Sequence, residues 1–463
     1  MESKKNRQAF LSGIWYTVSN FFMKAMVFLV TPVFTRMLTR EEFGLYHNFQ
    51  SWLMIFTILI TLNLEATLIR ARFEYADTLD MYIASVLVLS TVSCMVWLLL
   101  FLAFHQQFYA WTGLGRFYLV CMCIYFMFLP ALNLFLEQKR YFFQYRTAVA
   151  TGFLVAAAGA GLSVCFVSLL PDRLTGRILG QLLPTVAVGS ILYIYIIGKG
   201  KKICFSYWIY ALKICVPYIP HLLSLSLLNS VDKLMIRRIC GASDTALYSL
   251  AYTCGAVMTL LMTSLNGAFV PWLGERLAGR QFAEIRKVSA GYILVFSAAA
   301  AGMMLVAPEI LYVLGGKSYM EARYVMPPVV MGCVAQFIYT LFVNVEQFQK
   351  KTVGMAFASI SAAVFNYVLN LYFIPRYGYL AAAYTTLTGY LWLMLIHMMI
   401  VKKTGYGRVY DECFLFQVTV VLLCFMAAQN VLYDFFVIRY LCLAVYILFC
   451  IRVFFKKKGD ICR

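Results

Sequence analysis

Charge is scarce in this sequence. Asp, Glu, Lys and Arg make up 13% of its 463 residues, hydrophobic residues make up 63%, and the mean hydropathy is +0.79. Soluble domains carry about 25% charged residues. Most of the chain must therefore meet lipid or the interior of a membrane bundle. The net charge of +19 does not require nucleic acid as a partner, because basic loops also orient a membrane protein.

Residues with the spacing of metal or catalytic sites are also missing. Among the 14 cysteines the one close pair, Cys121 and Cys123, lies in an apolar run and is typical of buried thiols. The histidines are scattered: His47, His105, His221 and His397. The pair Gly316-Lys317 is the one fragment that suggests a phosphate-binding Walker A loop. Such a loop needs a glycine five residues before the pair, but that position is Leu311. We expect no metal, no cofactor and no enzymatic activity.

Long apolar segments dominate what is present. At ~20 residues per span they supply about fourteen membrane helices, joined by connections of at most roughly twenty residues. The first segment lacks a cleavage site and reads as a retained span. Loops on the side of the termini hold 26 Lys and Arg against 11 on the other side. Because basic residues face the cytoplasm, both termini are predicted to be cytoplasmic, in a multi-pass protein of the cell membrane.

Two connections resemble each other. Arg36, Leu45 and Tyr46 follow the first apolar segment as Arg238, Leu247 and Tyr248 follow the seventh. This repeated pattern predicts an all-α polytopic protein, with two pseudo-symmetric lobes of six helices each and a C-terminal pair of helices. The expected divisions are 1–199, 200–400 and 401–463. Transporters built from such repeats bind substrate between the halves.

Polar residues within the first span share one helix face, which includes Tyr16, Asn20 and Lys24. A charge at the centre of a bilayer costs about 2.5–3.5 kcal/mol, so such residues usually face a cavity or a partner. We expect this face to line a cavity, with Lys24 attracting anions. The alternative is a lysine that is paired structurally or snorkels to the interface.

The seventh span contains Pro217 and Pro220, which predict a kink or break. Ser230 and Lys233 share a face of this span, and Asp232 is placed to pair with a lysine. We expect these three to line the opposite lobe, although an interfacial role remains open because they lie near the outer surface. His221 is expected to be a structural histidine, with a proton relay as the alternative.

Two further charges, Glu65 and Arg70, end the second span on the predicted cytoplasmic side and are candidates for a cytoplasmic gate. Each is equally well explained as an anchor at the membrane surface.

Four stretches carry a recognisable pattern: TPVFTRMLTREEFGLY, NSVDKLMIRRICGASDTALYSLAY, VAPEILYVLGGKSY and FNYVLNLYFIPRYGYLAAAYTT. These stretches resemble polysaccharide-export flippases of the multidrug, oligosaccharidyl-lipid and polysaccharide exporter superfamily. Ala246 and Ala381 stand where glycine is usual. The positions that match the family pattern are Pro32, Arg36, Gly44, Tyr46, Arg238, Tyr248, Asn366, Asn370, Pro375 and Gly378.

The resemblance implies a flippase that moves a polyprenyl-diphosphate-linked oligosaccharide from the inner to the outer leaflet by alternating access. It also implies membrane lipid, a polysaccharide polymerase and chain-length proteins as partners of a monomer. A cation-coupled multidrug antiporter and a peptidoglycan-precursor flippase are the alternatives within the superfamily. A membrane-embedded polysaccharide polymerase or ligase is the alternative of a different class.

Overall fold

The computed structural model describes residues 26, 28–142, 144–349 and 352–461, and within these ranges it contains helices and no strand. The chain is therefore an all-α polytopic protein. It divides into two compact units, of which the first ends at Arg237 and the second begins at Arg238. The division into 1–199, 200–400 and 401–463 remains a prediction.

The first unit begins, in the described residues, with the short apolar helix Phe28–Met37. The helices that follow are α2 (Arg40–Thr61), η1 (Leu64–Thr67), α3 (Leu68–Glu74), η2 (Ala76–Thr78), α4 (Leu79–Ala103), α5 (His105–Thr112), α6 (Arg116–Tyr141), α7 (Tyr145–Leu169), α8 (Arg173–Gly200), α9 (Phe205–Cys215), η3 (Val216–Tyr218) and α10 (Ile219–Ile239).

The second unit continues with α11 (Ala242–Ala278), α12 (Phe282–Leu305), α13 (Ala307–Gly315), η4 (Lys317–Tyr324), α14 (Met326–Phe348), α15 (Thr352–Tyr377), α16 (Tyr379–Val401), η5 (Lys402–Tyr406), α17 (Glu412–Leu432) and α18 (Phe436–Ile461). Helix α14 is the core of this unit, since 78% of the residues in its most apolar 18-residue stretch are buried.

The described residues include 10 helices long and apolar enough to span a membrane, or up to 12 if each of two bent pairs counts as one span. The predicted number of fourteen is not confirmed. Most of the first predicted span lies outside the described residues. The apolar part of α18 found within them, Phe436–Leu448, is shorter than a span.

Local chemistry explains where several helices begin. Thr39 caps α2 by accepting a hydrogen bond from the Glu42 amide, and the Glu42 carboxylate accepts one from the Thr39 amide. Asp172 and Asp411 cap α8 and α17 through their carboxylates. These contacts satisfy amides that the first helical turn leaves without partners.

The two bent pairs have different causes. Between α2 and η1, Leu62 and Asn63 both adopt left-handed backbone conformations, with φ of 56° and 51°, and the span turns by 51°. Between α9 and α10 the chain turns by 43° where η3 contains Pro217, and Pro220 lies in the first turn of α10. A proline lacks the amide that would continue the helix.

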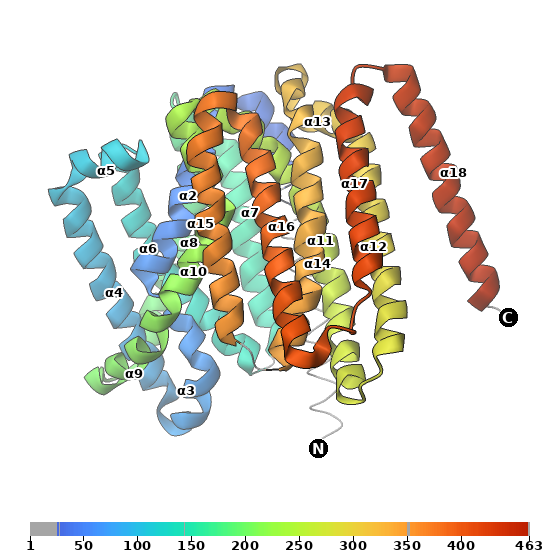
Figure 1. Cartoon of the computed structure of the whole chain (residues 1–463). Coiled ribbons are helices and arrows are strands. Elements are labelled where there is room, and N and C mark those ends of the chain that lie inside the picture. The colour runs from blue at the N-terminus through green and yellow to red at the C-terminus, as the bar shows by residue number, and fades with distance from the viewer. Residues whose placement is uncertain (1–25, 27, 143, 350–351, 462–463) are drawn as a thin grey trace. The chain divides into compact units, whose positions relative to one another are not determined.

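Helix α18 packs against α12 and α17 at the edge of the second unit (Figure 1). Its buried Arg439 donates two hydrogen bonds to the carboxylate of Glu309 in α13, with 2.8 Å between Nη1 and Oε2. The Tyr440 hydroxyl donates a third, at 2.7 Å. This contact fastens the last described helix to the unit.

Candidate functional site

A polar cluster lies inside the first unit where α2, α7 and α8 meet; it comprises Tyr46, Gln50, Ser163, Arg177 and Gln181 and is called the Tyr46 cluster here. The Tyr46 hydroxyl accepts hydrogen bonds from Gln50 Nε2 at 2.6 Å and Arg177 Nη2 at 2.9 Å. It donates to Gln181 Oε1 at 2.6 Å. Tyr46 is 7% exposed. A buried hydroxyl with three partners is held in a single orientation.

Glycines on α8 bring Arg177 against α7. A Cβ atom at Gly180 would lie 2.3 Å from the Cα of Ser163, and one at Gly176 would lie 2.6 Å from the backbone oxygen of Phe166. Only glycine permits so close an approach of the two backbones. Arg177, between these glycines, therefore reaches Ser163 and donates to its Oγ at 2.8 Å.

The guanidinium of Arg177 is stabilised by neutral groups. Its Cζ lies 3.7 Å from the ring centroid of Phe34 and 4.4 Å from that of Tyr46, so aromatic faces flank the cation. Within the part of the chain that the structure describes, no carboxylate forms an ion pair with Arg177. Its Nε is buried without a hydrogen-bond partner. The site thus holds positive charge that an anion can balance.

Two more basic side chains lie near this cation. His47 follows Tyr46 on α2, and both Arg177 and Lys233 are close enough to interact electrostatically with it. The His47 Nε2 atom is buried without a partner. Lys233, on α10, also interacts with Asp232. Three basic groups and one carboxylate therefore gather in the first unit.

The predicted residues of α10 lie next to this group. Asp232 is fully buried and Ser230 is 2% exposed. The Ser230 hydroxyl lies 3.5 Å from Met54 Sδ, which joins α10 to α2. Tyr16, Asn20 and Lys24 lie outside the described residues, as does the side chain of His221.

The two residues predicted to form a cytoplasmic gate, Glu65 and Arg70, do not contact the same groups. Glu65, in η1, accepts a hydrogen bond from Asn133 Nδ2 of α6 at 3.0 Å, and its second carboxylate oxygen is buried without a partner. Arg70 is exposed on α3. The structure gives no ion pair between these two described residues.

The matched family positions fall on three parts of the chain. Pro32 and Arg36 lie on the helix Phe28–Met37, and Gly44 and Tyr46 lie on α2. Arg238 lies on α10 and the buried Tyr248 on α11. The others lie on α15 or at its junction with α16 and are Asn366, Asn370, Pro375 and Gly378.

The two asparagines form a buried amide cluster. Asn370 Nδ2 donates to Asn366 Oδ1 at 3.1 Å, and Asn366 Nδ2 donates to Thr386 Oγ1 at 3.4 Å. The Thr385 hydroxyl donates to Asn370 Oδ1. Gly378 has φ of +70° where the chain turns from α15 into α16, a conformation that favours glycine.

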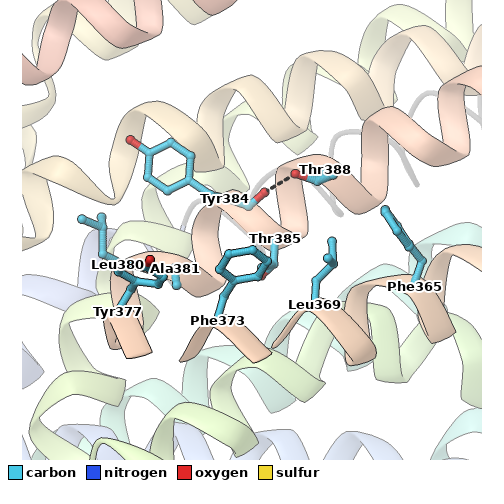
Figure 2. Close-up of a pocket in the computed structure, with 9 residues that line it drawn as sticks. All are labelled: Phe365, Leu369, Phe373, Tyr377, Leu380, Ala381, Tyr384, Thr385 and Thr388. Carbon is cyan, nitrogen blue, oxygen red and sulfur yellow. Dashed lines mark hydrogen bonds between the residues drawn. The ribbon is translucent and has the colours of Figure 1, made fainter. Parts of the chain in front are cut away.

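An apolar groove of about 600 Å³ lies along α15 and α16 beside this amide cluster (Figure 2). Aromatic rings from both helices face it, and Tyr377, at one end, is 68% exposed. The lining residues are Phe365, Leu369, Phe373, Tyr377, Leu380, Ala381, Tyr384, Thr385 and Thr388.

Sequence reasoning missed Arg177, Gln181 and the role of His47. Arg177 is one of the 11 basic residues counted in loops on the side opposite the termini, but α8 begins at Arg173, one turn earlier. The glycines at 176 and 180 were the available signal, because two glycines four residues apart indicate a face on which another helix packs closely, and Arg177 borders that face.

Comparison with known proteins places the chain in a family. Residues 11–276, more than half of the chain, match the family described as "Polysaccharide biosynthesis protein". The chain belongs to this family. Residues 217–372 also match the family described as MatE. These matches and the fold confirm the predicted relationship to superfamily flippases.

Individual relatives are distant. A protein of the Lsg locus of Haemophilus influenzae is 21% identical over 348 residues, covering 73% of this chain and 84% of the relative. Among solved structures, the lipid II flippase MurJ in an inward closed conformation has a TM-score of 0.73 at 13% identity, covering 97% and 100% of the two chains. An inward-facing multidrug resistance MATE transporter has a TM-score of 0.57 at 14% identity, covering 83% and 95%. These structural likenesses show that this member of the polysaccharide biosynthesis protein family has the flippase and transporter fold.

Proposed function

We propose that this protein moves a polyprenyl-diphosphate-linked oligosaccharide, the repeat unit of a cell-surface polysaccharide, from the inner to the outer leaflet of the cytoplasmic membrane. A diphosphate and its sugars cannot cross hydrocarbon unaided, because removing water from charged and polar groups is costly. A protein that carries them must replace that hydration with its own polar groups, and alternating access then presents the head group to each side in turn.

The observation that carries the proposal is the Arg177 guanidinium, which is enclosed by neutral partners and has Lys233 and His47 as basic neighbours. An arginine binds phosphate oxygens through paired N–H donors. The Tyr46 cluster already fixes one of its donors on the tyrosine hydroxyl. Lys24, Asn20 and Tyr16 of the first span are proposed to complete the polar surface for the substrate.

The test is translocation in proteoliposomes loaded with polyprenyl-diphosphate oligosaccharide, read by a membrane-impermeant probe of the outer leaflet. Arg177→Gln keeps hydrogen-bonding capacity but removes the charge, and we expect translocation to fall about tenfold or more. Arg173→Gln is the matched control, since Arg173 begins the same helix and is exposed. Equal translocation by both variants would remove Arg177 from the mechanism. Lys24→Ala tests the first span separately in the same assay.

The apolar groove is proposed to hold part of the polyprenyl chain. Its lining is largely aromatic and aliphatic, and its helix α15 carries Val364 and Val368, which are 57% and 55% exposed to the surroundings of the unit. Apolar surface on a membrane helix is covered by lipid chains, so a groove there offers one chain a larger contact area.

Thr388→Trp tests the groove, because Thr388 is exposed on its wall and a large side chain there would fill it. We expect slower translocation of the long-chain substrate and unchanged protein abundance. Val368→Trp places the same side chain on α15 outside the groove and should leave translocation unchanged. If the two variants behave alike, the groove does not hold the lipid.

A cation-coupled antiporter is the second candidate, favoured by the MatE match over residues 217–372. The same proteoliposomes distinguish the two. Efflux of cationic dyes against a sodium or proton gradient, with no transfer of several lipid-linked glycans, would establish the antiporter.

A further inference from the structure

A carboxylate and an imidazole meet in the interior of the second unit. Glu346 lies near the end of α14 and His397 near the end of α16. His397 Nδ1 and Glu346 Oε1 are 2.7 Å apart. The Glu346 side chain is 0% exposed and the His397 side chain is 2% exposed. Both helices belong to the apolar spans of this unit, so this acid and base are enclosed by protein within the membrane region.

The second carboxylate oxygen of Glu346, Oε2, is buried and has no hydrogen-bond partner. Buried polar atoms without partners are uncommon, because each forfeits the hydrogen bonds it made with water. Oε2 therefore keeps its lone pairs free, and a proton can add to the carboxylate there.

The immediate surroundings supply no compensating charge from the described side chains. The His397 ring stacks on Tyr339, with centroids 5.6 Å apart, and Tyr339 stacks in turn on Tyr390. Tyr390 interacts with Tyr252 of α11. The Tyr410 hydroxyl donates to the backbone oxygen of Leu341 in α14.

Two basic side chains on the neighbouring elements have partners elsewhere. Lys402 of η5 pairs with Glu412 of α17 at 3.0 Å, and Arg286 of α12 donates to the backbone oxygen of Arg408. The titratable side chains described on α15 begin at Tyr367, toward its opposite end. Lys350 and Lys351 lie outside the described residues.

We propose that Glu346 and His397 form a proton-binding site in the second unit. With one proton in excess over the carboxylate and neutral imidazole, the pair is neutral overall, either as carboxylate with imidazolium or as carboxylic acid with imidazole. Loss of that proton to water leaves one uncompensated negative charge in a low-dielectric interior. Such a charge is strongly destabilising unless water or a cation reaches it.

Proton release therefore favours separation of α14 from α16 at this end, which lets water reach the carboxylate. Proton binding restores the tight contact. The site is thus a protonation-dependent clamp between two helices of one unit. It rests on the geometry of this pair alone and does not depend on which substrate the protein moves.

The test uses the purified full-length protein in lipid nanodiscs with no substrate present. Amide hydrogen exchange of α14 and α16, corrected for intrinsic exchange rates, is compared at about pH 5 and about pH 8, the range over which imidazole titrates. We expect peptides around Glu346 and His397 to lose protection about tenfold at the higher pH in the wild type. The double variant Glu346→Gln with His397→Gln should show no such change.

Glu412→Gln is the matched control, because it breaks the exposed pair with Lys402 beside the same helix end. It should keep the wild-type pH dependence. The single variant Glu346→Gln, in which the amide still accepts from the imidazole, serves if the double variant does not fold. Protection in the wild type that does not change with pH would overturn the proposal. So would the same pH dependence in a Gln variant, or its suppression by sodium, which would indicate a cation in place of the proton.

Discussion

Arg177 illustrates how a single half-buried cation is stabilised without a counterion. The Tyr46 hydroxyl, the Ser163 hydroxyl and the faces of two aromatic rings surround it. Neutral hydroxyl acceptors and aromatic rings orient a guanidinium but do not cancel its charge. The remaining positive field is therefore available to a ligand, which is what a binding site for an anionic head group requires.

Glu309 shows the opposite arrangement, in which a carboxylate is paired with a cation, Arg439. Burial alone would raise its pKa, but the hydrogen bonds from Arg439 and Tyr440 outweigh this effect and leave the pKa below its usual 4.5. The charged carboxylate is thus the form that the folded protein favours. The contact contributes its full stability above pH 4.5 and loses it as the pH falls through the lowered pKa.

We therefore expect α18 to loosen from α12 and α17 as the pH falls below 4.5. Hydrogen exchange of α18, corrected for intrinsic rates, measures this. Glu309→Gln should abolish the acid dependence of that loosening while weakening α18 packing at neutral pH. Unchanged α18 protection in the acidified wild type would contradict the assignment.

At this scale the sequence revealed part of the site. Composition and spacing singled out Asp232, Lys233 and Ser230, which lie on α10 near α2. They did not reveal Arg177, because placing the start of a helix one turn too late assigns a core residue to a loop. Glu346 and His397 are 51 residues apart, and nothing local in the sequence announces that they meet.

Among the elements, α7 and α8 form the seam on which the Tyr46 cluster depends. Gly180→Ala would place a methyl group 2.3 Å from a backbone atom of Ser163, so the helices must shift apart. We expect a loss of about 1–3 kcal/mol in stability, together with reduced translocation because Arg177 moves with α8. Thermal unfolding and the proteoliposome assay measure the two effects.

Gly198→Ala is the control on the same helix, since nothing lies within 4 Å of a Cβ atom there. It should be neutral or stabilising by up to about 1 kcal/mol. If Gly180→Ala were as neutral or stabilising as Gly198→Ala, helix propensity rather than the close packing of α7 on α8 would determine the outcome.

The bends show why element-level prediction succeeded in one place and failed in another. Pro217 and Pro220 predict a bend from the sequence alone, and the chain turns by 43° there. The 51° turn at Leu62 and Asn63 has no glycine or proline to announce it. It arises from how the segment packs, which a pattern of apolar residues does not encode.

For the molecule as a whole, one prediction that can be tested directly is the orientation of the chain in the membrane. Cys413 is exposed at the start of α17, which the distribution of Lys and Arg places at the cytoplasmic face. A membrane-impermeant maleimide should therefore leave Cys413 unmodified in intact cells and modify it after the membrane is opened. Mass spectrometry of the peptide identifies the site, and Cys413→Ser confirms it. Modification in intact cells would reverse the orientation.

The contact between Arg439 and Glu309 also bears on how the protein is made. Chains emerge from the ribosome N-terminus first, so Glu309 enters the membrane long before Arg439 is synthesised. An arginine in an apolar helix raises the cost of insertion, and the described apolar part of α18 is short. Helix α18 therefore inserts most favourably against a unit that has already assembled and presents the Glu309 carboxylate. Stable insertion of α18 thus depends on the correct placement of α13.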